Sequence, residues 1–116
     1  VVTYNQEKYI RQCLQSVVDQ ITDFEFEVVI ADDCSTDNTK NIILEFAEKY
    51  PNKVYALFNK KNIGPYNNFV YVHQQAKGEY IAHVDGDDYC LLGKLQAQAE
   101  ILSSDPNCNI VWRTVQ

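Results

Sequence analysis

Hydrophobic and polar positions along this chain repeat with two periods, one typical of helices and one typical of strands. Between residues 7 and 20, apolar side chains recur every three or four positions, which predicts an amphipathic helix with one face toward a core. They are Ile10, Cys13, Leu14, Val17 and Val18. Residues 26–31 are apolar except for Glu27, which indicates a strand buried on both faces. We interpret the β-branched residues 1–3 as part of a first strand, so the pattern begins strand, helix, strand.

A second helix and a third strand are predicted next. The polar residues 35–37 offer candidates for the helix N-cap, and Pro51 is expected to end the helix. Its apolar face consists of Ile42, Ile43, Phe46 and Tyr50. Residues 54–58 then predict the third strand, and residues 59–65 a loop.

The same alternation continues to the end of the chain. A third helix is predicted over 67–76, with Gly78 as its C-cap. Its inward residues are expected to be Phe69, Val70, His73 and Ala76. A fourth strand is predicted at 79–84 and a fifth at 109–115. The last helix, over 94–103, is expected to turn inward Leu95, Ala99 and Leu102.

Regular alternation of strands and helices predicts a single α/β domain over residues 1–116, with a mostly parallel sheet and helices on both faces. In such sheets ligands bind beyond the carboxyl ends of the strands. Polar clusters follow three of the predicted strands, at residues 3–5, 32–33 and 85–88. We therefore expect these clusters to converge in space.

Composition narrows the class of partner. The formal net charge is -6, so the surface should repel nucleic acid, whose binding requires Lys and Arg to neutralise phosphates. A small phosphate compound could still bind if a divalent cation lay between the two sets of negative charge. No apolar run approaches the roughly 18 residues of a membrane span, and the four cysteines show no zinc-site spacing. We expect a soluble, intracellular domain with reduced thiols.

The acidic run Asp85-Gly86-Asp87-Asp88 is the strongest candidate site. Its oxygen-only ligands, Asp85, Asp87 and Asp88, suit Mg²⁺ or Mn²⁺, whose remaining positions are usually completed by water and substrate phosphates. Two alternatives are a solvated turn and a calcium loop. The calcium loop is disfavoured because no Glu stands at the twelfth position from Asp85. A cation is required if the run lies in a cleft, where carboxylates repel strongly.

Other candidates are individually ambiguous. Asp32 and Asp33 follow a buried strand and could either cap the next helix or accept hydrogen bonds from a nucleoside. Tyr4 could be a core aromatic or a surface on which a base stacks, and the turn Asn62-Ile63-Gly64 is uninformative by itself. His73 and His83 are interpreted as structural histidines, because neither has a nucleophile partner in a recognisable motif.

Taken together, these segments resemble family 2 glycosyltransferases of the Rossmann-like GT-A fold. The resemblance rests on the order of Val2-Thr3-Tyr4-Asn5, the stretch 29–37, Asn62-Ile63-Gly64, and the stretch 77–81 that leads into Asp85–Asp88. It implies a nucleotide-sugar site, with Asp33 on the base and Asp85-x-Asp87 on ribose and a Mn²⁺ or Mg²⁺ ion. The residues implied in nucleotide binding are Thr3, Tyr4, Asn5, Asp32, Asp33, Asn62, Gly64 and Asp85, and those implied in metal binding are Asp85, Asp87 and Asp88.

The resemblance also implies an activity, which is transfer of a sugar from a UDP-sugar donor to an acceptor hydroxyl, with inversion, in polysaccharide or glycan biosynthesis. It implies a location in the cytoplasm, either free or peripheral at the membrane face. The expected Pro after the acidic run and the basic residue after Asn62-Ile63-Gly64 are missing, which puts donor phosphate contacts from that turn in doubt. The general base and acceptor pocket are expected beyond Gln116, so we expect a fragment that binds a donor without turnover.

Two rival classes fit parts of the pattern. A phospho-acceptor receiver domain shares the length, acidity and strand-helix alternation, but its phosphorylated Asp should end the third strand, where this chain has Asn59. A nucleotidyltransferase would need a Gly-rich phosphate loop with Arg and Lys after the first strand. The chain has Tyr4-Asn5 there.

Overall fold

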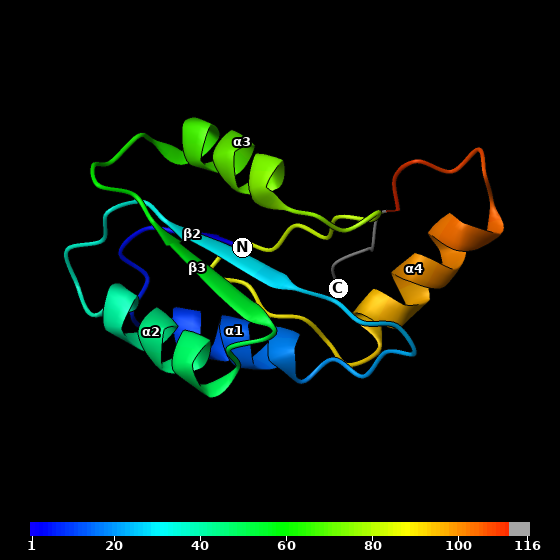
Figure 1. The fold of residues 1–116 in the computed structure, drawn as a ribbon, viewed down its shortest axis with the longest axis horizontal. Coiled ribbons are helices and arrows are strands. Elements are labelled where there is room, and N and C mark those ends of the chain that lie inside the picture. Colours follow the sequence, from blue (N-terminus) through cyan, green and yellow to red (C-terminus); the bar gives the residue numbers. More distant parts are fainter. Residues whose placement is uncertain (112–116) are drawn as a thin grey trace.

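The protein is described by a computed structural model over residues 1–111, and that part of the chain folds as a parallel sheet with helices on both faces. The strands are β1 (Val2–Thr3), β2 (Val28–Asp32) and β3 (Val54–Phe58). The helices are α1 (Ile10–Val18), α2 (Thr39–Lys49), α3 (Pro65–Gln75) and α4 (Lys94–Ser104). Figure 1 shows α1 and α2 on one face of the sheet and α3 on the other. The predicted α/β architecture is confirmed.

The sheet brings the carboxyl ends of its strands into register. Its order is β1-β2-β3, and both pairings are parallel. Thr3 lies opposite Asp32, which lies opposite Phe58, so all three strands end at one edge. Polar residues that follow the strands therefore emerge side by side.

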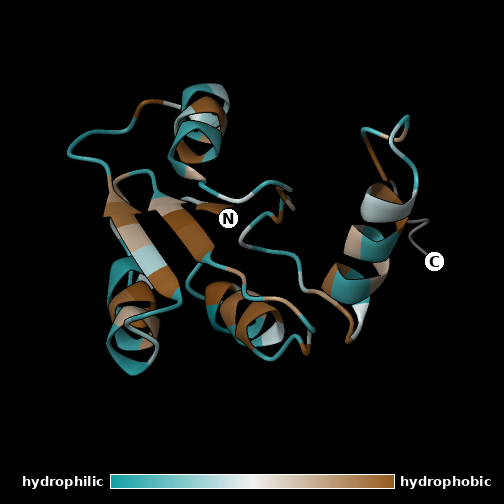
Figure 2. Ribbon diagram, turned by 45° about the vertical axis from the view of Figure 1, so that its right-hand side comes forward, coloured by the Kyte–Doolittle hydropathy of each residue, from teal (hydrophilic) through white to brown (hydrophobic). Residues whose placement is uncertain are grey.

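The core lies between the sheet and the pair α1 and α2. The predicted inward stripe of α1 is fully confirmed, since Ile10, Cys13 and Leu14 are completely buried and Val17 and Val18 almost so. From α2 the core takes Ile42, Ile43 and Phe46, which pack with Ile30 of β2. Burying each such side chain contributes about 1.5–3 kcal/mol, so this cluster is the main source of stability. In Figure 2 the hydrophobic sides of both helices face the sheet.

The predicted fourth strand is wrong as a regular element. Residues 79–84 form no strand, and the segment joins the sheet only through an isolated parallel bridge between Val2 and Asp85. Gly86 N–H donates to the Val2 carbonyl at 2.8 Å. Because β1 comprises Val2–Thr3, it supplies too few partners for a longer ladder. Residues 109–111 are not in a strand either, and the rest of the predicted fifth strand lies outside the described residues.

The inward face of α3 also differs from the prediction. Phe69 is 41% exposed, while Asn68 and Val72 are the buried residues of this helix. Val70, His73 and Ala76 are half-buried. The reason is that the buried Asn68 amide donates to the Ala31 carbonyl at 3.0 Å, a contact that hydropathy cannot predict. Ala76 already has an extended conformation, so Gly78 is not the C-cap.

Helix α4 stands apart from the sheet in both ribbon views (Figures 1 and 2). Its predicted bounds are confirmed to within one residue, but among the described residues none of its side chains is fully buried. The buried Gln20, just after α1, holds its start: Gln20 donates to the Leu91 carbonyl and accepts from the Leu95 N–H. In the part of the chain that the structure describes, no helix is long and apolar enough to cross a membrane.

Candidate functional site

The three polar clusters meet at the carboxyl edge of the sheet, as predicted. Asp33 N–H donates to the Thr3 carbonyl at 3.0 Å, which places the end of β2 beside the end of β1. On the other side of β1, Gly86 N–H donates to the Val2 carbonyl. Thr3, Asp33 and the acidic run are thus neighbours through backbone contacts, although more than 80 positions separate the first from the last.

Gly86 is at this edge because there is no room for a side chain. A Cβ on Gly86 would lie 2.8 Å from both Cβ and Oγ1 of Thr3 and closer still to Oε1 of Gln6. Thr3 cannot move aside easily, since it is buried in β1 and its hydroxyl donates to Gln6. The glycine therefore lets the acidic loop pack directly on the first strand.

The acidic cluster has the donor set of a divalent cation site. One carboxylate oxygen from each of Asp85, Asp87 and Asp88 lies within 4.8 Å of the others. Within residues 1–111, no Lys or Arg forms an ion pair with any of the three. Three oxygen ligands without a competing cationic side chain fit Mg²⁺ or Mn²⁺.

The cluster is open to solvent rather than enclosed in a cleft. All three carboxylates are exposed in the described structure. Repulsion between charges about 4 Å apart is then closer to the roughly 1 kcal/mol of bulk water than to the roughly 4 kcal/mol of a protein site. The cluster is therefore stable without a cation, and repulsion alone does not demand one.

Cys13 of α1 contacts the backbone of the acidic run. Its Sγ lies 3.5 Å from the Asp85 carbonyl, and the Asp88 N–H donates to the same carbonyl at 2.9 Å. Burial raises the pKa of the Cys13 thiol to about 12. The thiol therefore stays protonated and remains a donor. All four cysteines, Cys13, Cys34, Cys90 and Cys108, are free thiols.

Asp33 binds the loop between β3 and α3. Its Oδ1 accepts hydrogen bonds from Ile63 N–H at 2.9 Å and from Asn59 Nδ2 at 3.0 Å, and its Oδ2 accepts one from Gly64 N–H at 2.9 Å. Asp33 is only 2% exposed, so these hydrogen bonds replace those that its carboxylate would make to water in the unfolded chain. A carboxylate offers about four acceptor positions, so the contacts made by residues 1–111 leave one position unused.

Asp32 is occupied differently, because it closes the turn that follows β2. It is buried and accepts hydrogen bonds from the backbone N–H and the hydroxyl of Ser35. Between them Cys34 adopts a positive φ of 65°. Asp32 therefore does not cap the next helix, since the N-cap of α2 is Asn38; its carboxylate shapes the loop before that helix.

Asn5 links the end of β1 to the same loop. Its own φ is 49°, a left-handed conformation that Asn tolerates better than most residues. Its Oδ1 accepts from Thr36 N–H at 2.7 Å, and its backbone N–H donates to Ser35 Oγ at 2.9 Å. Asn5 is thus a structural link between two parts of the site, while its neighbour Tyr4 is 46% exposed and does not belong to the core.

The Asn62-Ile63-Gly64 turn is attached to the site rather than isolated on the surface. Asn62 Nδ2 donates to the Asp33 carbonyl at 3.2 Å, and Asn62 Oδ1 accepts from Gly64 N–H at 3.2 Å. Gly64 has a φ of 89°, which favours glycine. Asp33 and Asn62 therefore hold each other in place across the edge of the sheet.

Sequence reasoning missed two residues that organise this edge. Asn59 Nδ2 contacts both Asp33 Oδ1 and Asn68 Oδ1, the latter at 2.9 Å, and Asn68 reaches back to β2. Hydropathy gave no signal for Asn68, because its burial depends on the distant Ala31 carbonyl. Nothing in the local pattern pointed to Asn59.

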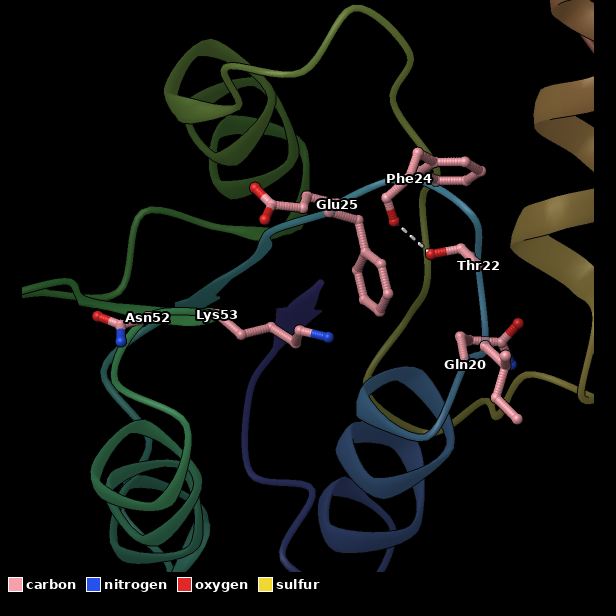
Figure 3. A pocket seen from close by; sticks show the side chains of 8 residues that line it. Gln20, Thr22, Phe24, Glu25, Asn52 and Lys53 are labelled. Carbon is pink, nitrogen blue, oxygen red and sulfur yellow. Dashed lines mark hydrogen bonds between the residues drawn. The ribbon is translucent and has the colours of Figure 1, made fainter.

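A pocket of the described residues lies elsewhere. It is lined at the amino ends of β2 and β3 by residues that include Gln20, Phe24, Glu25, Asn52 and Lys53, as Figure 3 shows. The predicted site residues all lie at the carboxyl ends. We place the candidate site at the carboxyl edge because the convergent polar groups are there.

The chain is similar to bacterial proteins over nearly all its length. An uncharacterized protein of Mycobacterium tuberculosis is 41% identical over 116 residues, which cover 99% of this chain and 34% of that protein. Poly(ribitol-phosphate) beta-N-acetylglucosaminyltransferase TarS of Staphylococcus aureus is 45% identical over 92 residues, which cover 77% of this chain and 16% of TarS. The chain thus spans about a third or less of these relatives.

Solved structures agree with this similarity. The crystal structure of S. aureus TarS 1-349 in complex with UDP matches with a TM-score of 0.74 and 38% identity, over 89% of this chain and 30% of that one. The mannosyltransferase PcManGT from Pyrobaculum calidifontis, in complex with GDP-Man and Mn²⁺, matches with a TM-score of 0.78 and 25% identity, over 90% and 31% respectively. These are glycosyltransferase structures, not receiver domains.

The family match covers the whole chain. The Glycosyl transferase family 2 pattern extends over residues 1–116, which include every cluster at the carboxyl edge of the sheet. The resemblance in the motif order is confirmed, and the chain belongs to glycosyltransferase family 2.

Proposed function

We propose that this chain is the donor-binding part of a glycosyltransferase that takes a nucleoside-diphosphate sugar, with UDP-sugar as the expected donor, together with Mn²⁺ or Mg²⁺. The observation that carries the proposal is the convergence of Thr3, Asp33 and the acidic run at one edge of the sheet. Two structural relatives support it, since one is in complex with UDP and the other with GDP-Man and Mn²⁺.

Each end of the donor would meet a different part of this edge. The base would lie against Tyr4 and use the remaining acceptor position of Asp33. The diphosphate would lie toward Asp85, Asp87 and Asp88, which would hold the cation. A divalent cation there supplies neutralisation of the charge that develops on the nucleoside-diphosphate leaving group. Asp32, Asn5, Asn62 and Gly64 would shape the loops around the donor.

The remaining part of the reaction is proposed from the family. An acceptor hydroxyl would attack the anomeric carbon from the face opposite the leaving group, with inversion, and a general base would remove its proton. We assign no base within the described residues. A place in polysaccharide or glycan biosynthesis agrees with the relatives, which include a putative teichuronic acid biosynthesis glycosyltransferase of Bacillus subtilis that is 33% identical over 100 residues.

Thermal unfolding in the presence of UDP, GDP or CDP, each with Mn²⁺, tests both the donor class and the identity of its nucleobase. A ligand at 100 times its dissociation constant should raise the free energy of unfolding by about 2.7 kcal/mol. We expect UDP to give the largest rise in Tm. The Asp87→Asn variant should lose this rise, while the matched surface change Asp23→Asn should keep it. A well-folded chain that responds to no nucleoside diphosphate would contradict the proposal.

A further inference from the structure

An aromatic cluster beside the acidic run is not used by the proposed function so far. It consists of Phe69 and His73, one turn apart on α3, and His83, two residues before the acidic run. The ring centroids of Phe69 and His83 are 4.8 Å apart, and those of His73 and His83 are 5.3 Å apart with the rings nearly parallel. The His83 ring therefore packs against two neighbouring side chains of α3.

His83 makes a hydrogen bond to the first carboxylate of the run. Its Nε2 lies 2.9 Å from Asp85 Oδ1. Its Nδ1 is buried, and within residues 1–111 it has no hydrogen-bond partner. A neutral imidazole carries its hydrogen on one nitrogen only, and a buried N–H without an acceptor would be costly. The hydrogen is therefore best placed on Nε2, which donates it to Asp85.

Asp85 is unusual among the three acids in having its side chain fixed. Its backbone is held by the bridge to Val2, and its carboxylate is held by His83. For the carboxylates of Asp87 and Asp88, the described part of the chain provides no hydrogen-bond donor. The contact occupies Oδ1 of Asp85 and leaves Oδ2 open toward a ligand.

We propose that His83 is a positioning residue that orients the Asp85 carboxylate for the divalent cation, and that α3 holds His83 in place through Phe69 and His73. The inference rests on the proposed function, because it concerns the same cation. Ligating carboxylates are commonly fixed by such outer partners, and losing one typically lowers metal affinity by about 10- to 100-fold. His83 would thus connect α3 to the donor site without touching the donor.

Three variants separate orientation from packing. His83→Phe keeps an aromatic ring in the cluster but removes the donor, so Mn²⁺ affinity in the presence of UDP should fall by about 10- to 100-fold. His83→Gln keeps an N–H donor at a similar reach and should recover most of that affinity. The surface change Asp23→Asn touches none of these residues, so its affinity should match the parent chain.

Electron paramagnetic resonance of free Mn²⁺, titrated into each variant with UDP, measures these affinities. In the metal-free parent, nitrogen-15 shifts of the imidazoles should place the His83 hydrogen on Nε2, independently of any cation. If the parent binds Mn²⁺ and His83→Phe binds it equally well, His83 has no positioning role and the proposed function stands. If the parent binds no Mn²⁺ with UDP, the proposed function fails, and the positioning role fails with it.

Discussion

The carboxylate of Asp33 accepts the backbone N–H of Gly64 at 2.9 Å, across a gap of 31 positions in the sequence. This bond ties the loop before α3 to the end of β2. Asp33 therefore has a structural role in addition to its proposed role in recognising the nucleobase. The consequences of the two roles can be measured separately.

Replacing Asp33 with Asn should destabilise the fold even without a ligand. The amide keeps the shape but turns one acceptor oxygen into a donor, so one of the three hydrogen bonds from Asn59, Ile63 and Gly64 is lost. Hydrogen bonds to charged groups contribute about 1.5–3 kcal/mol each. Urea unfolding of Asp33→Asn should show a loss of this size.

The exposed Asp23 offers a matched control for this change. Asp23→Asn should leave the free energy of unfolding within about 0.5 kcal/mol of the parent. If Asp33→Asn is as stable as Asp23→Asn, the loop is not held by Asp33, and the hydrogen bonds that Asp33 accepts do not stabilise the fold.

Gly86→Ala should disturb both stability and the site. The added methyl would lie 2.8 Å from Thr3 Cβ, which cannot retreat because Thr3 is buried in β1. Overpacking of this kind costs about 1–3 kcal/mol. For a domain of this size we expect Tm to fall by about 4 °C per kcal/mol. A scanning calorimeter measures the fall, and an unchanged Tm would mean that the acidic loop does not pack on β1.

Asp37 should contribute stability that depends on pH. Burial pushes its pKa upward, but hydrogen bonds from the Thr39 hydroxyl and from the backbone N–H groups of Thr39 and Glu7 outweigh it, and its pKa lies below the usual value. A depressed pKa means that the stabilisation is present above the unfolded pKa of about 3.9 and is lost as pH falls through the folded pKa.

The variant Asp37→Ala tests this dependence. At pH 7 it should lose about 1 kcal/mol, a typical cost of removing a side-chain acceptor at a helix start. The difference from the parent should shrink as pH falls below about 3.9, because the parent carboxyl then becomes progressively protonated. Urea unfolding at pH 7, 5 and 3 measures it, and a difference that stays constant or grows in acid would contradict the assignment.

The cysteines should react in two classes. Cys13 and Cys90 are buried, whereas Cys34 and Cys108 are half-buried. Burial also raises the pKa of Cys13 to about 12, so no thiolate is available there at pH 8. Iodoacetamide at pH 8 should therefore modify Cys34 and Cys108 first and reach Cys13 only in denaturant. Peptide mass spectrometry reads the sites directly, and early modification of Cys13 would show that α1 is not packed as described.

Local patterns predicted the fold well because its elements are amphipathic in the simplest way. The stripe on α1 and the buried run of β2 depend on spacing within one segment, which the sequence shows directly. The α3 face was mispredicted for the opposite reason. Burial of Asn68 depends on the Ala31 carbonyl, 37 positions away, and no periodicity carries that information.

The site was predictable in position but not in its internal connections. Parallel strands place their carboxyl ends at one edge, so the convergence of Thr3, Asp33 and Asp85 followed from topology. Two contacts could be seen only once the three-dimensional path of the chain was known. They are the contact of Asp33 with the 59–64 loop and that of His83 with Asp85. The expected fourth strand failed for a related reason, since a strand needs partners that β1 supplies only at Val2.

The most direct test of the central claim is calorimetric titration of UDP into this chain, once with Mn²⁺ and once with excess EDTA. The account predicts saturable binding with Mn²⁺ that is lost in EDTA and lost again in Asp87→Asn, while Asp23→Asn binds like the parent. Binding of equal affinity with and without the cation, or no binding to a folded chain under either condition, would contradict a cation-dependent donor site at Asp85–Asp88.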